Sequence, residues 1–127
     1  MTAGLHRAMG VFRRFFDRLQ ESDEARLSTE IRSWAEQVPG TTRIAEAPVR
    51  EPVKIAGVIK RMTVFPMEGK ESLEALVSDG SGEAVVVFMG RRGIGGLTLG
   101  SRVVVEGVLG EQRGQLKMIN PRLEFSA

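Results

Sequence analysis

The segment over residues 73–88 constrains the fold of this chain more than any other stretch. Two apolar runs, each alternating with period two, flank the corner Asp79-Gly80-Ser81-Gly82. Such alternation is typical of β-strands, and a short glycine-rich corner joins two strands in a hairpin. Gly80 and Gly82 can adopt the positive φ that the corner needs, and Asp79 can bond to its own turn. The segment therefore predicts a β-hairpin.

One more strand is predicted before this hairpin and two are predicted after it. The first covers about residues 53–64, with Gly57 at a bend, and the fourth covers about residues 102–109. The fifth covers about residues 115–125 and is interrupted by Asn120-Pro121. Five strands in about 75 residues match the size and strand count of a small OB-type barrel. Such barrels mostly bind oligonucleotides or proteins on one face.

The N-terminal part of the chain is predicted to be helical. Apolar side chains recur at spacings of three and four over residues 5–20, beside several arginines, which indicates a basic amphipathic helix. A second helix is expected to begin at Ser22 and to end before Pro39-Gly40. Trp34 lies at core spacing on this helix.

We therefore predict a mainly β protein with N-terminal helices. The predicted domains are a helical segment and linker over residues 1–47 and a five-stranded OB-fold barrel over residues 48–127. Residues 40–52 contain prolines and few apolar side chains, which is typical of a linker.

The composition argues against an enzyme. The 127 residues include no Cys and no Tyr, and the one His lies near the N-terminus. The carboxylates do not pair at a metal-ligand spacing, and the glycine-rich residues 90–96 lack the Gly-Lys-Ser/Thr ending of a phosphate-binding loop. We predict no catalytic residue, no metal and no cofactor. The lack of Cys and of a ~20-residue apolar stretch leads us to expect a cytoplasmic protein without a membrane span.

Alternation with period two also assigns the two faces of the sheet. The side chains expected in the interior are Leu73, Ala75, Val77, Ala84, Val86, Phe88, Val103, Val105 and Leu109. The opposite face is too apolar to contact water alone, which is typical of an interface or of a covered surface. The residues predicted for such an interface are Leu76, Val85, Val87 and Met89 of the sheet and Phe12, Phe15 and Phe16 of the first helix.

Cations are predicted along the rim of the barrel. Single-stranded nucleic acid is usually held by aromatic side chains that stack on bases, beside cations that contact phosphates. The residues predicted to bind nucleic acid are Lys54, Lys60, Arg61, Phe65, Arg91, Arg92, Arg113, Lys117 and Arg122. Against this function, the net charge is only +2, and the centre of the outer face lacks aromatic residues.

Several short motifs resemble a known family. They are Phe12-Arg13-Arg14-Phe15, Val77-Ser78-Asp79-Gly80-Ser81-Gly82, Gly90-Arg91-Arg92 with Ile94 and Gly96, Leu99-Gly100 and Asn120-Pro121-Arg122. On these motifs the chain resembles small actinobacterial proteins of the OB-fold nucleic-acid-binding family. The hairpin is also similar to the wedge barrel of branch-migration helicases and to tRNA anticodon-binding barrels. The resemblance spans most of the chain and implies nucleic-acid binding through Arg91, Arg92 and Arg122.

Two functions remain open at this point. The first is a small non-enzymatic module that binds nucleic acid, most readily single-stranded and with low sequence specificity, through the rim cations. The alternative is a protein-interaction or oligomerisation module, for example a homodimer, that uses the apolar sheet face or the first helix.

Overall fold

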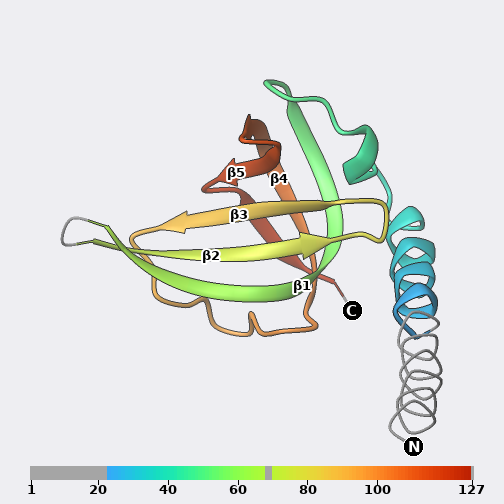
Figure 1. Ribbon diagram of the computed structural model, residues 1–127, viewed down its shortest axis with the longest axis horizontal. Helices are drawn as coiled ribbons and strands as arrows, with labels where there is room; N and C mark the ends of the chain where they lie inside the picture. The colour runs from blue at the N-terminus through green and yellow to red at the C-terminus, as the bar shows by residue number, and fades with distance from the viewer. Residues whose placement is uncertain (1–22, 68–69, 127) are drawn as a thin grey trace, which may run out of the picture.

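The computed structural model describes residues 23–67 and 70–126 (Figure 1). It contains a helix over residues 23–36, a short 3-10 helix η1 (Ile44–Glu46) and a six-stranded sheet. The strands are β1 (Pro52–Met67), β2 (Lys70–Ser78), β3 (Glu83–Met89), β4 (Arg102–Gln112), β5 (Gln115–Ile119) and β6 (Arg122–Phe125). The predicted helix over residues 5–20, with its three Phe residues, lies outside the described residues.

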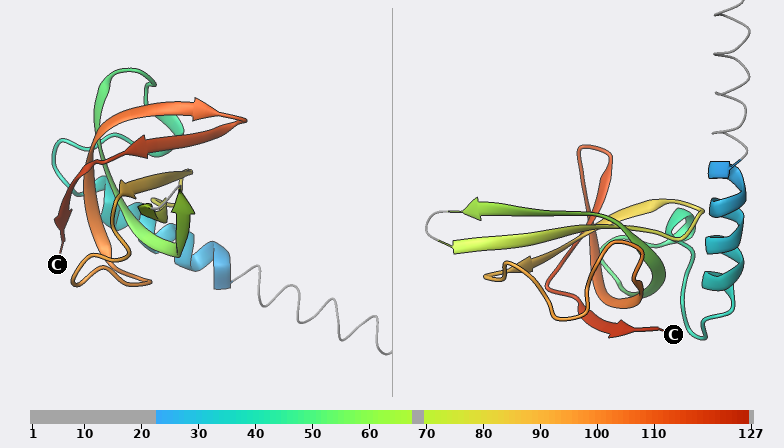
Figure 2. Two further views of the ribbon diagram at one scale, coloured as in Figure 1. Left: turned by 90° about the vertical axis from the view of Figure 1, so that its left-hand side faces the viewer. Right: turned by 90° about the horizontal axis from the view of Figure 1, so that it is seen from below.

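Five strands close the sheet into a ring. The neighbours run β1-β2-β3-β5-β4, and β4 also pairs with β1, so that the two ends of the row meet (Figure 2). The pair β3–β5 is parallel, and the other pairs are antiparallel. The predicted five-strand, mainly β architecture is confirmed. The fifth predicted strand divides at Asn120-Pro121, as expected, and β6 pairs with β4 outside the ring.

β1 belongs to both halves of the ring because it bends. Its first half, up to Val58, pairs with β4, whereas its second half pairs with β2. The bend brings Gly57 against the β2 strand. A Cβ at Gly57 would clash with a methyl group of Val77 and lie 2.9 Å from the carbonyl oxygen of Ser78. Only glycine fits there, which confirms the bend predicted at this position.

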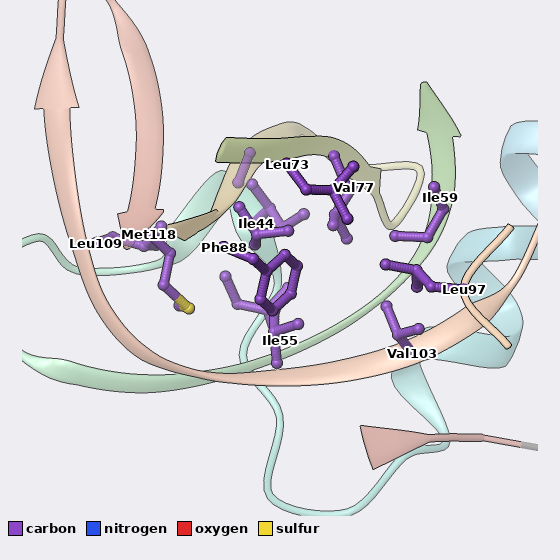
Figure 3. Packing of buried hydrophobic residues seen from close by; sticks show 14 of the residues in the cluster. Ile44, Ile55, Ile59, Leu73, Val77, Phe88, Leu97, Val103, Leu109 and Met118 are labelled. Atoms are coloured by element: carbon purple, nitrogen blue, oxygen red, sulfur yellow. The ribbon is translucent and has the colours of Figure 1, made fainter. Parts of the chain in front are cut away.

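The interior of the ring is the hydrophobic core. Side chains from all five ring strands point toward one another there (Figure 3). All nine residues predicted to face the interior belong to this buried cluster. The cluster also contains Val53, Ile55 and Ile59 of β1, Met118 of β5, Leu97 from the coil that joins β3 to β4, and Ile44. The period-two assignment of the inner face is therefore correct.

The segment predicted as a linker contributes to this core, which corrects the interpretation of residues 40–52. Ile44 in η1 is 2% exposed and packs among the core side chains. The buried Asp79 carboxylate accepts a hydrogen bond from the backbone N–H of Ile44 (2.8 Å). The same carboxylate accepts bonds from the N–H groups of Ser81 and Gly82 and from the Ser81 hydroxyl. The few apolar residues of this stretch show no periodic spacing, so the burial of Ile44 could not be predicted.

The helix over residues 23–36 packs on the outside of the ring, beside the β2–β3 corner (Figure 1). Trp34, Ala35 and Val38 contact Ala56 of β1 and Val104 of β4. The Arg32 guanidinium donates a hydrogen bond to the carbonyl oxygen of Gly80 (2.8 Å). Trp34 therefore packs on the sheet, as its spacing predicted, and the guanidinium of Arg102 lies 5.1 Å from the centre of its ring.

Candidate nucleic-acid interface

The outer surface of β1, β2, β3 and β5 is not part of the contact made by this helix. Strand register arranges its side chains in three rows that cross the strands. The first row is Arg61, Leu76, Val85 and Lys117; the second is Thr63, Glu74, Val87 and Ile119; the third is Phe65, Ser72 and Met89. We call this surface the outer face. Its middle holds Leu76, Val85 and Val87 together with Glu74, and Arg61, Lys117 and the Phe65 ring lie at its borders.

The centre of the outer face is covered by its own side chains. Val85 and Val87 are each 7% exposed although they point away from the core. Glu74 on β2 and Lys117 on β5 form an ion pair (3.7 Å) across β3, the strand that carries both valines. The pair therefore bridges the two strands that flank β3. The ion pair lies above Val85 and Val87 and contributes to their low exposure, so no further helix or strand is needed to cover them.

The third row supplies the aromatic side chain of the outer face. Phe65 is 44% exposed, and Met89 on β3 lies in the same row and is also exposed. Ser72 lies between them on β2; its hydroxyl is buried and has no hydrogen-bond partner among the described residues. The Asn120 side chain accepts a hydrogen bond from the Met89 N–H (2.9 Å) and so anchors the end of β3 to the β5–β6 corner.

Two adjoining hollows lie along the first row. One, of about 310 Å³, is lined by Arg61, Thr63, Phe65, Glu74, Ala75, Leu76, Val85 and Gln115. The other, of about 300 Å³, is lined by Gln112, Arg113, Gln115 and Lys117. Gln115 borders both. The fold thus brings four of the predicted nucleic-acid-binding residues, Phe65 and three cations, to one continuous surface.

The β4–β5 turn positions Arg113. Gln112 pairs with Gln115, so the turn has two residues, Arg113 and Gly114. Their φ angles are 52° and 77°, and positive φ at both central positions is the feature of a type I′ turn. Arg113 therefore occupies a left-handed conformation, which costs an arginine more than it costs Asn or Gly.

The other five predicted cations do not line these two hollows. Lys54 lines a hollow beside Glu106 on the β1–β4 side, and Lys60 lies at a β-bulge in β1. Arg122 lies on β6, opposite Glu106 of β4. Arg91 and Arg92 are exposed in the coil after β3, and Arg92 forms an ion pair with Glu71 of β2. Of the eight predicted cations, three therefore line the two hollows: Arg61, Arg113 and Lys117.

A further hollow continues from the outer face onto β4. It measures about 790 Å³ and has a mainly apolar lining that includes Val108, Leu109 and Ile119, with Arg50, Glu111 and Lys117 among its polar residues. Val108 and Ile119 are 51% and 57% exposed. A Cβ on Gly110 would meet only the Lys117 carbonyl oxygen, at 3.9 Å, so the space above this glycine is open.

Several residues of this surface were absent from the predicted site. They are Arg50, Thr63, Glu74, Val108, Gln115 and Ile119. Alternation along each strand identifies Glu74 and Val108 as outward, but it does not show which strands become neighbours. That pairing, above all the parallel pairing of β3 with β5, has no local signal in the sequence.

Among residues 23–67 and 70–126, no group of three or more His, Asp or Glu side chains could hold a metal ion. Within the same part of the chain, no helix combines the length and the apolar character needed to cross a bilayer.

The chain is similar to solved structures that share its fold. No family model and no curated protein matches its sequence. One similar structure is a replication protein A heterotrimer bound to single-stranded DNA (TM-score 0.50, 12% identity, covering 72% of this chain and 69% of that chain). Another is the OB domain of Ta0387 from Thermoplasma acidophilum (TM-score 0.51, 15% identity, covering 68% of this chain and 86% of that chain). At these identities the likeness concerns the fold alone, and the chain has an OB fold.

Proposed function

We propose that this chain binds single-stranded nucleic acid, with low sequence specificity, on the outer face. The observation that carries the proposal is the meeting of one exposed aromatic ring, Phe65, with Arg61, Arg113 and Lys117 around two adjoining hollows. An aromatic ring can stack on any base, and cations placed beside it can contact the phosphates that flank the base. The likeness in fold to a protein bound to single-stranded DNA supports the same function.

The character of the face favours unpaired strands over a duplex. Reading a duplex requires an element that enters a groove, and strong duplex binding generally accompanies a large positive charge. The net charge of this chain is +2, and the outer face is a sheet surface with one aromatic ring at its border. Few side chains there could read base edges, so we expect weak sequence preference and strong dependence on salt.

We further propose that the chain is a non-enzymatic, cytoplasmic module that belongs to the actinobacterial OB-fold nucleic-acid-binding family. Its barrel domain would span residues 48–127, preceded by a helical segment.

Fluorescence anisotropy of labelled single-stranded and duplex oligonucleotides tests the function. We expect micromolar binding to the single strand at low salt and much weaker binding at moderate salt. Phe65→Ala should weaken it by about 5- to 150-fold, the size of one lost base stack. Phe125→Ala is the matched control, because this half-exposed Phe lies on β6 beside Gly96, outside the three rows. No single-strand binding at low salt would refute the proposal.

The second candidate is a protein-binding function at the β4 hollow. Its exposed apolar residues Val108 and Ile119, with Arg50 and Lys117 against a single Glu111, fit an acidic peptide that carries an apolar side chain. Gly110→Val fills the hollow from a strand position at which a Cβ meets no close neighbour. Loss of a bound peptide in this variant, with nucleic-acid binding unchanged, would favour the second candidate.

A further inference from the structure

The ion pair between Glu74 and Lys117 is the most enclosed of the four ion pairs among the described residues. Its side chains are 27% and 31% exposed, whereas each of the other three pairs has side chains that are at least 40% exposed. Solvent screens an enclosed pair less than an exposed one, so this attraction is the least weakened by water.

The position of the pair matters more than its strength. Glu74 and Lys117 extend from β2 and β5 over the strand between them, above the buried Val85 and Val87. Lys117 also lines two of the hollows described above, and Glu74 lines the hollow that contains Phe65. The carboxylate therefore lies where a strand stacked on Phe65 and bound by Lys117 would pass.

A carboxylate and a phosphate compete for the same donor. Both are anions that attract an ammonium group, and the Lys117 ammonium lies 3.7 Å from the Glu74 carboxylate in this structure. A phosphate on the outer face must draw Lys117 away from Glu74 or share it, and it must also tolerate the repulsion of the carboxylate.

We propose that Glu74 competes with phosphate for Lys117 and so limits the affinity of the outer face for nucleic acid. The inference rests on the proposed function and deepens it. In the native chain, the Glu74 carboxylate limits how strongly Lys117 can bind a phosphate. The carboxylate lowers the affinity of this face for any polyanion.

A charge-matched pair of variants tests this role. Glu74→Gln removes the competing carboxylate while keeping the size of the side chain, and Glu124→Gln removes one carboxylate from the exposed strand β6. Lys117→Gln and the double variant Glu74→Gln/Lys117→Gln complete a double-mutant cycle. All proteins are titrated against the same labelled single-stranded oligonucleotide at several salt concentrations, and thermal melting verifies that each is folded.

We expect Glu74→Gln to bind about tenfold more tightly than the native chain, the size of one added charge-assisted contact. Its slope of log K against log salt should steepen by about 0.7, the value for one more neutralised phosphate on a single strand. Lys117→Gln should cancel the gain in the double variant, and Glu124→Gln should show a much smaller one.

Three results would overturn the inference while leaving the proposed function intact. They are unchanged affinity in Glu74→Gln, a gain equal to that of Glu124→Gln, and weaker binding, which would mean that Glu74 contacts the ligand directly. Absence of binding by every folded variant would overturn both the inference and the proposed function.

Discussion

At the scale of single residues, Asp79 links parts of the chain that are distant in sequence. Its carboxylate accepts hydrogen bonds from its own corner, at Ser81 and Gly82, and from the N–H of Ile44, which is 35 residues earlier. A buried carboxylate is tolerated only where several donors satisfy it, and here they do. The corner therefore fixes the β2–β3 hairpin and also holds Ile44 in the core.

Replacing Asp79 should destabilise the protein strongly. Asp79→Ala leaves the N–H groups of Ile44, Ser81 and Gly82 without their acceptor, and we expect a loss of about 3 kcal/mol in the free energy of unfolding. Urea unfolding followed by circular dichroism measures it. Ser81→Ala removes only the hydroxyl and should cost about 1 kcal/mol. An unchanged urea midpoint for Asp79→Ala would show that this network contributes nothing.

At the scale of elements, the β4–β5 hairpin combines a structural cost with a proposed function. Arg113 holds a φ of 52° in a two-residue turn, where Asn is favoured before Gly. Arg113 is thus less suited to this turn than Asn, but its cation borders the outer face. Strain of this kind is often found at functional sites.

Arg113→Asn should separate stability from binding. Asn before Gly114 matches the type I′ turn, so we expect equal or greater thermal stability. Loss of the cation should weaken oligonucleotide binding and reduce the salt slope by about 0.7. Arg122→Asn, on β6, removes the same charge outside the outer face and should retain most of the affinity. The site assignment would be wrong if the two variants bound alike.

At the scale of the whole molecule, the helix over residues 23–36 determines which part of the sheet surface is covered. It packs on Ala56 and Val104, on the β1–β4 side of the ring, and so covers one apolar patch of the outer surface. On the β1-β2-β3-β5 surface, the Glu74–Lys117 ion pair spans β3 above the buried Val85 and Val87. The helix thus stabilises the ring without occupying the proposed binding surface.

A charge at the helix–sheet contact should detach the helix and leave the ring folded. Ala35→Glu places a carboxylate against Ala56 and Val104, whereas Ser33→Glu adds the same charge at an exposed position of the same helix. Trp34 is the only tryptophan, so its emission reports this contact. We expect a red shift for Ala35→Glu and none for Ser33→Glu, with oligonucleotide binding retained in both. An unshifted emission for Ala35→Glu would show that the contact tolerates the charge.

The sequence by itself determined the local structure of this protein. Alternation with period two identified the strands and every core residue that it assigned, because a strand alternates its side chains between two faces. Gly57 marked the bend in β1, and Asn120-Pro121 marked the break after β5, since both act through the backbone of their own segment.

Only the tertiary structure decided which of these residues meet. Pairing of β3 with β5 placed Lys117 within reach of Glu74, while Arg92 paired with Glu71 and Arg122 lay opposite Glu106. Ile44 entered the core from a polar stretch, and the N–H groups of Ile44 and Ala45 donate hydrogen bonds to Asp79 and Ser81 of the distant corner. Contacts between distant segments depend on which strands pair when the ring closes, and the local alternation of side chains does not determine that pairing.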